Sequence, residues 1–142
     1  MHEKYIENAE EKLEAAEYLL KGAFYNDAVS RAYYSMFYSA KALLSLKEIY
    51  PKAHKGVITK FGLEFVKKGF VEDVYGHALS HAKDRREVAD YDIGKIIGAE
   101  EAESIVEDAE KFLVRIKEAI KEIQNNIELF MSDMQIQGKD NG

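Results

Sequence analysis

The stretch that decides the fold is Ala32-Tyr33-Tyr34-Ser35-Met36-Phe37-Tyr38-Ser39-Ala40, which carries no charged side chain, and Ala42-Leu43-Leu44 continues it. A helix that is apolar on nearly all sides lies in the middle of a bundle. The sequence therefore predicts a central helix over residues 26–47. The tyrosine hydroxyls inside such a bundle need hydrogen-bond partners. Small residues at helical spacing would let another helix approach closely; they are Ala28, Ala32, Ser35, Ser39 and Ala42.

An amphipathic helix is expected before the central one. Apolar residues recur at intervals of three and four over residues 5–20, which is the pattern of a helix with one buried face. Lys21-Gly22 ends this segment, and Asn26 or Asp27 is available to cap the central helix.

Three further helices are expected after Pro51. A short one carries Val57 to Phe65 and ends at Lys68-Gly69, and a fourth begins near Val71. Asp90-Tyr91-Asp92, followed by two glycines, predicts a connection. A long last helix is then predicted from Ala99 to Phe130.

The fold class that follows is all-α: an up-and-down bundle of four to five helices with a long C-terminal helix. Residues 1–131 are expected to form the bundle, and residues 132–142, which are polar and contain two glycines, a frayed tail. The apolar length of the last helix and the small-residue face of the central helix exceed what one bundle needs. We therefore expect a homodimer.

Composition excludes several classes of protein. The chain has 142 residues, a net charge of -6, one proline and no cysteine. A disulfide framework, a cysteine-ligated metal and a thiol nucleophile are thereby excluded. The sequence shows no signal-peptide pattern and no uncharged apolar run of about 18 residues. We expect a cytoplasmic protein that does not associate with membranes.

The region from residue 41 to residue 70 is basic although the whole chain is acidic. It has seven lysines and two glutamates, a net charge of +5. A local basic patch can hold a phosphate or a nucleotide. A solvated lysine-bearing surface is the alternative.

His77, His81 and Asp84 fall on one face of the fourth predicted helix, as a metal site of two histidines and a carboxylate requires. This spacing is common by chance, so we expect ordinary histidines, no metal and no other cofactor.

The most specific polar group is the run Arg85-Arg86-Glu87-Val88-Ala89-Asp90-Tyr91, at the margin of an apolar face. One interpretation is structural, with an arginine fixing helix packing through Asp90 or a carboxylate of another helix. The other is an arginine offered to a phosphate, with Asp90 and Tyr91 orienting it.

Taken together, several blocks of the sequence resemble the HEPN domain, and in particular its small single-domain prokaryotic branch. The resemblance runs from about Ala9 to about Leu113. The blocks that carry it are residues 27–38 and 42–44, then 54–58, 61–62 and 65–69, and finally 86–91.

The resemblance implies a helical bundle that dimerises and is often encoded beside a minimal nucleotidyltransferase in a toxin–antitoxin pair. Many relatives are metal-independent ribonucleases that use an arginine followed four to six residues later by a histidine. Arg86 matches this arginine, but Asp90 and Tyr91 stand where the histidine is expected. Aspartate is ionised near neutral pH and is a poor proton donor. Whether the chain is an enzyme is therefore left open.

The candidate catalytic residues are Arg86, Asp90, Tyr91 and His81, and the candidate ligand-binding residues are Arg86, Arg85, Asp90, Tyr91, His54 and Lys55. His54 matches a histidine of the resembling branch, although its place before Lys55-Gly56 is equally typical of a contact at a helix start.

Three functions remain at this point. The first is a module that binds a nucleotide or RNA phosphate, or a nucleotidyltransferase partner. The second is a metal-independent endoribonuclease toxin. The third is a non-catalytic adaptor for another protein. The missing histidine favours the first over the second.

Overall fold

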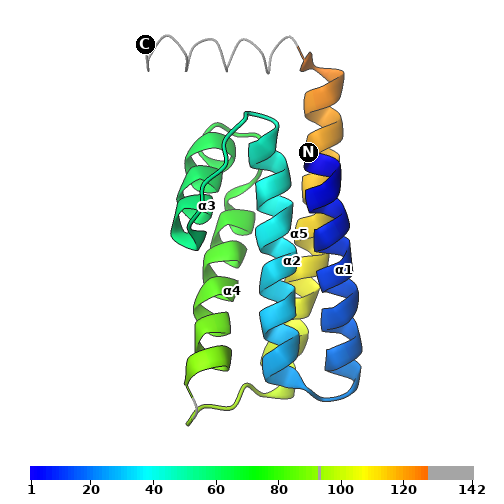
Figure 1. Cartoon of the computed structure of the whole chain (residues 1–142), viewed down its shortest axis with the longest axis vertical. Helices are drawn as coiled ribbons and strands as arrows, with labels where there is room; N and C mark the ends of the chain where they lie inside the picture. The colour runs from blue at the N-terminus through cyan, green and yellow to red at the C-terminus, as the bar shows by residue number, and fades with distance from the viewer. Residues whose placement is uncertain (93, 128–142) are drawn as a thin grey trace.

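A computed structural model describes residues 1–92 and 94–127, and within them the chain forms five α-helices, one π-helical turn and no strand. The elements in chain order are α1 (His2–Lys21), α2 (Tyr25–Ser45), α3 (His54–Phe61), the π-helical turn η1 (Gly62–Val66), α4 (Asp73–Tyr91) and α5 (Ala99–Asn125). Helices α1, α2, α4 and α5 run up and down in one bundle, and short α3 lies beside α4 near one end (Figure 1). The all-α prediction is confirmed.

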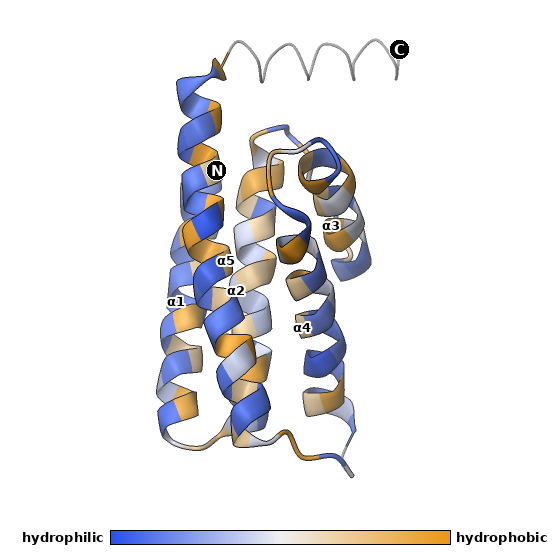
Figure 2. Ribbon diagram, turned by 180° about the vertical axis from the view of Figure 1, so that it is seen from behind, coloured by the Kyte–Doolittle hydropathy of each residue, from blue (hydrophilic) through white to orange (hydrophobic). Residues whose placement is uncertain are grey.

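Helix α2 is the centre of the bundle, as its sequence predicts. It packs against α1, α4 and α5, and side chains such as Tyr33, Met36 and Leu43 are fully buried. The outer helices present their polar residues to solvent (Figure 2). No helix within the described residues is long and apolar enough to span a lipid bilayer.

The small-residue face of α2 is used inside the chain. Ala28, Ala32 and Ala42 are fully buried, and the Ser35 hydroxyl donates to the carbonyl of Ala9 on α1 at 2.8 Å. This face allows the close approach of α1 and therefore cannot also receive a second copy of the chain. The expectation of a dimer therefore rests on the apolar length of α5 and on the resemblance to the HEPN domain.

The start of α2 differs from the prediction that Asn26 or Asp27 caps it. The residue at the N-cap is Phe24, and no side chain caps the helix. Asn26 lies inside the first turn, donates to the carbonyl of Ala89 at 3.3 Å and accepts from the amide of Ile97 at 3.1 Å. Its amide thus joins α2 to the end of α4 and to the segment before α5.

Helix α4 extends further than predicted. Asp90 and Tyr91 belong to its last turn rather than to a connection. An ion pair between Arg86 and Asp90, four residues apart, supports that turn. Helix α5 begins at Ala99 as predicted, whereas its predicted end at Phe130 and the tail at 132–142 lie outside the described residues.

Candidate functional site

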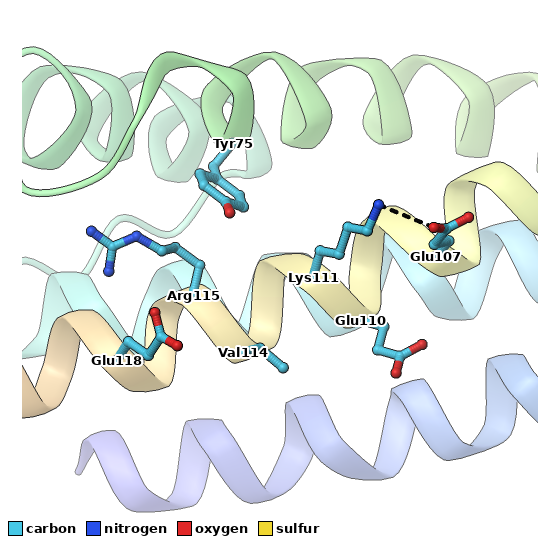
Figure 3. Close-up of a pocket in the computed structure, with 7 residues that line it drawn as sticks. All are labelled: Tyr75, Glu107, Glu110, Lys111, Val114, Arg115 and Glu118. Atoms are coloured by element: carbon cyan, nitrogen blue, oxygen red, sulfur yellow. Dashed lines mark ion pairs between the residues drawn. The ribbon is translucent and has the colours of Figure 1, made fainter.

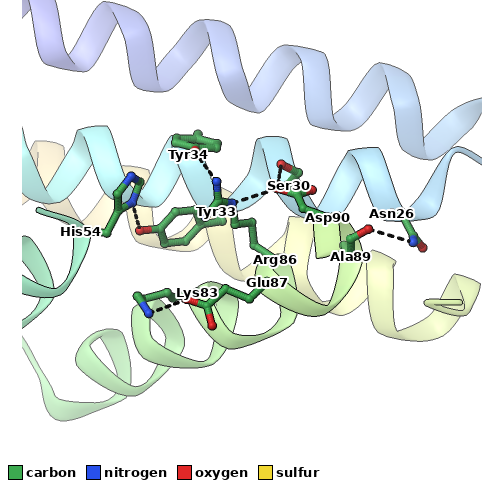
Figure 4. A network of polar contacts seen from close by, with 10 residues as sticks. All are labelled: Asn26, Ser30, Tyr33, Tyr34, His54, Lys83, Arg86, Glu87, Ala89 and Asp90. Carbon is green, nitrogen blue, oxygen red and sulfur yellow. Dashed lines mark hydrogen bonds and ion pairs between the residues drawn. The ribbon is translucent and has the colours of Figure 1, made fainter. Parts of the chain in front are cut away.

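The candidate site lies where the outward side of α2 meets α4, and Arg86 is at its centre (Figure 4). One terminal nitrogen of its guanidinium donates to the hydroxyl of Tyr34 at 2.6 Å. The Nε atom lies 3.0 Å from a carboxylate oxygen of Asp90, and the Ser30 hydroxyl donates to the same oxygen at 3.5 Å. Arg86 is therefore held by both helices.

Three tyrosine rings surround the Arg86 guanidinium. Its central carbon lies 5.1 Å from the ring centre of Tyr34, 5.8 Å from that of Tyr33 and 5.6 Å from that of Tyr91. A cation over an aromatic ring is stabilised by the ring quadrupole. The Arg86 side chain is only 15% exposed, while Tyr91 is 71% exposed. The positive charge thus lies beneath a partly aromatic surface.

The Nε–H of Arg86 is buried and is not aligned with any acceptor, although the Asp90 oxygen is close. The contact is consequently an ion pair rather than a directed hydrogen bond. The arginine fixes α4 against α2 through Tyr34 and Asp90, as the structural interpretation expects.

His54, the first residue of α3, reaches the same face. Its Nδ1 atom lies 2.7 Å from the hydroxyl of Tyr33, and its ring stacks on Phe37 with ring centres 4.4 Å apart. Tyr34 also contacts the imidazole edge to face. His54 and Arg86 therefore share Tyr33 and Tyr34 as neighbours.

The electrostatic surroundings of His54 are predominantly positive. Burial lowers the pKa of its imidazole, and the charges of Arg86, Lys83 and Lys41 lower that pKa further, whereas Glu87 opposes them. Three cations and one carboxylate thus act on a half-buried ring that is neutral at pH 7. Such a surface attracts an anion.

The pKa values of two neighbouring groups, Tyr33 and Glu87, are shifted as well. Burial raises the pKa of the Tyr33 hydroxyl far above its usual range, so the hydroxyl stays protonated. A hydrogen bond from Lys83 at 2.7 Å lowers the pKa of Glu87, so the carboxylate stays ionised and offsets part of the positive charge of the face.

Other residues singled out from the sequence lie elsewhere. Arg85 forms an ion pair and hydrogen bonds with Glu101 on α5 and is not part of the Arg86 network. His81 is exposed and lies near Asp108 of α5. Burial raises the pKa of the Asp108 carboxyl, and the charges of Lys111 and His81 oppose that rise. Lys55 is exposed and directly follows His54.

Within the described residues, His77, His81 and Asp84 do not come together as a metal site. His77, His81 and Asp84 are all exposed. Across residues 1–92 and 94–127, no three His, Cys, Asp or Glu side chains lie together as a metal site needs.

A cavity of about 400 Å³ lies apart from this face, between α4 and α5 (Figure 3). Its charged lining comprises three glutamates and two cations. One of these cations, Arg115, forms an ion pair at 2.7 Å with Glu72, which is not a lining residue. Carboxylates repel a phosphate, so the size of this cavity does not make it the better phosphate site. Its lining residues are Tyr75, Glu107, Glu110, Lys111, Val114, Arg115 and Glu118.

Helix α2 contributes members of the site that were not predicted from the sequence. Tyr33, Tyr34 and Phe37 lie three, four and seven residues after Ser30, so they share one helical face with it. The signal was the need of the buried tyrosine hydroxyls for partners. Which partners they have depends on how α3 and α4 pack against α2.

The helical bundle agrees with the family to which the chain belongs. Residues 2–120 match the HEPN domain family, and the chain is a member of it. Two similar proteins come from Methanocaldococcus jannaschii. "Putative toxin MJ0605" is 52% identical over 83% of this chain and 87% of its own length, and "Putative toxin MJ0142" is 45% identical over 88% and 84%. A "UPF0332 protein" of Thermotoga maritima is 35% identical over 86% of this chain and 96% of its own.

Proposed function

We propose that this HEPN module belongs to a toxin–antitoxin-type pair and binds a phosphate group of RNA or of a nucleotide on the face formed by His54, Arg86, Lys83 and Lys41. The observation that carries the proposal is the position of the His54 ring among cations: it stacks on Phe37, over which Lys41 lies, and it shares the Tyr33–Tyr34 surface with Arg86. Two of its relatives are named as toxins, which agrees with this assignment.

The aromatic residues of the face suit the same ligand. Tyr91 is largely exposed beside the Arg86 guanidinium, and a nucleobase can stack on such a ring. Arg86 itself is mostly buried, so it contributes its charge, while Lys83 and Lys41 are the cations that can move to meet a phosphate. Asp90 orients Arg86, and Lys55 adds a further charge beside His54.

Binding of a short fluorescently labelled single-stranded RNA, followed by anisotropy, tests the proposal. Replacing Lys41 and Lys83 together by glutamine is expected to weaken binding by about tenfold. The plot of log affinity against log salt has a negative slope, and the magnitude of this slope is expected to decrease by about 1.4. Each phosphate contact with single-stranded RNA contributes about 0.7 to it.

The matched control replaces Lys117 and Lys121 of α5 by glutamine, which removes the same charge from another part of the surface. This control is expected to bind RNA like the parent. Equal binding by both double variants would refute the proposed site. No RNA binding by the parent would leave the adaptor function in its place.

A metal-independent ribonuclease is the second candidate, because an imidazole and a guanidinium share the Tyr33–Tyr34 surface. RNA cleavage can use a group that transfers protons beside a group that stabilises phosphate charge. Gel analysis of the same RNA after incubation with the protein and EDTA separates cleavage from binding. Cleavage that is lost when His54 is replaced by alanine would put this candidate first.

The remaining proposals concern partners. A homodimer and a minimal nucleotidyltransferase partner are what membership of the family suggests. Val114 on α5 and Ile127, two residues beyond the end of that helix, are exposed apolar residues. Light scattering of the purified protein is expected to give about twice 16.2 kDa. A single 16.2 kDa species at every concentration would contradict the dimer.

A further inference from the structure

The contact between Tyr33 and His54 selects one of the two neutral forms of the imidazole. The Tyr33 hydroxyl is buried, and Nδ1 of His54 is its hydrogen-bond partner at 2.7 Å. If Nδ1 carried the proton, the hydroxyl would accept, and its own hydrogen would have no acceptor within the described part of the chain. A buried donor without an acceptor costs about 1–3 kcal/mol. The hydroxyl therefore donates to Nδ1.

A neutral imidazole that accepts at Nδ1 carries its hydrogen on Nε2. Stacking on Phe37 fixes the plane of the ring, and the Tyr33 contact fixes its rotation. Nε2 makes no hydrogen bond within residues 1–92 and 94–127, and the ring is only half-buried. His54 thus presents a fixed N–H donor at the surface without carrying a charge.

The neighbours of this donor are cations. Lys41 lies over the same Phe37 ring at 5.3 Å, and Lys83, paired with Glu87, is close enough to affect the imidazole. We propose that Tyr33 is a positioning residue that holds His54 in the Nε2–H form, so that this N–H donates to a phosphate oxygen flanked by the ammonium groups of Lys83 and Lys41. This inference rests on the proposed phosphate-binding function and assigns the direct contact to His54 rather than to Arg86.

NMR of the four histidines tests the role of Tyr33 without any ligand. A hydroxyl that donates to Nδ1 stabilises the neutral ring, so Tyr33→Phe is expected to raise the measured pKa of His54. A hydroxyl that accepted from Nδ1–H would stabilise the charged ring, and the same substitution would then lower the pKa. A lowered or unchanged pKa, or a proton on Nδ1 in long-range 1H–15N spectra, would overturn the inference.

Titration with inorganic phosphate tests the contact itself. Phosphate is expected to shift the His54 signals and raise the pKa of His54, because the anion stabilises the imidazolium. His77 and His81 are exposed on α4 and serve as internal controls whose signals stay in place. Equal shifts of all four histidines would reveal nonspecific association and contradict the site.

Two substitutions separate the contributions of the two ring nitrogens. The amide nitrogen of glutamine can take the place of Nε2, and the amide of asparagine can take the place of Nδ1. His54→Gln is expected to keep RNA affinity within about twofold, while His54→Asn keeps the Tyr33 contact and weakens binding by about fivefold, the equivalent of one hydrogen bond. A purely structural His54 would give the same affinity in both variants or the reverse order.

The same assay distinguishes failure of this inference from failure of the proposed function. If the lysine double variant loses RNA binding and the two His54 variants do not differ, the face binds phosphate but His54 is not the donor. If neither the lysine double variant nor the two His54 variants change RNA binding, the proposed function fails as well. Parallel titrations with adenosine 5′-monophosphate and with RNA show whether the phosphate comes from a free nucleotide or from a chain.

Discussion

Phe37→Ala is expected to destabilise the protein by roughly 3–5 kcal/mol, the usual range for truncating a buried phenylalanine. Phe37 is 6% exposed and contacts the rings of Tyr33, Tyr38 and His54. Removing it opens a cavity between α2 and α3 and takes away the surface on which His54 stacks. In a domain of this size the melting temperature is expected to fall by about 10 °C or more.

Calorimetry or urea unfolding followed by circular dichroism measures this change. The matched control is Phe24→Ala, because Phe24 is 60% exposed; its effect is expected to stay near 0.5 kcal/mol. If Phe37→Ala does not fold, Phe37→Leu keeps most of the apolar volume and is expected to show a smaller loss in the same direction. A Phe37→Ala protein as stable as the parent would contradict the placement of α2 at the centre.

Arg86→Ala is expected to lower the free energy of unfolding by roughly 2–3 kcal/mol. The substitution removes the donor to the Tyr34 hydroxyl and leaves the Asp90 carboxylate, which is 28% exposed, without its cation. Breaking a fully buried ion pair costs about 3–5 kcal/mol, and partial exposure of Asp90 reduces that figure.

Three companion variants show whether the loss comes from the network. The Arg86→Ala/Asp90→Ala double variant is expected to be more stable than the sum of the single changes predicts, because no carboxylate is then left unpaired. Arg86→Lys keeps a charge but cannot donate to both partners, so it is expected to lie between Arg86→Ala and the parent. Arg31→Ala removes an exposed arginine of α2 and is expected to change stability by about 0.5 kcal/mol. Equal effects of Arg86→Ala and Arg31→Ala would refute the structural role of Arg86.

The helical architecture was predictable because it follows from local periodicity. The charge-free run around Met36 requires a buried helix, and the need of its tyrosine hydroxyls for partners is met by His54 and Arg86. The predicted end of α4 was wrong. The sequence Asp-Tyr-Asp before glycines is typical of a turn, but the ion pair of Asp90 with Arg86 keeps that segment helical.

The details of the site depend on contacts between helices, which periodicity does not encode. Asn26 suits an N-cap by composition, but its amide reaches Ala89 and Ile97 in other segments. Arg85 and Arg86 are adjacent in sequence and face different partners, because neighbouring positions on a helix point about 100° apart. Which arginine joins the tyrosines is decided only when α4 packs on α2.

The contact of Tyr34 with Arg86 spans 52 residues of chain, and that of Tyr33 with His54 spans 21. Synthesis adds residues in order, so a nascent chain that has released α1 to α3 contains both the histidine and its tyrosine partner but lacks the guanidinium and Lys83. The positive charge of the face is completed only after α4 has left the ribosome and docked. A product of premature termination before residue 83 therefore contains Tyr33, Tyr34 and Phe37 but neither Lys83 nor Arg86.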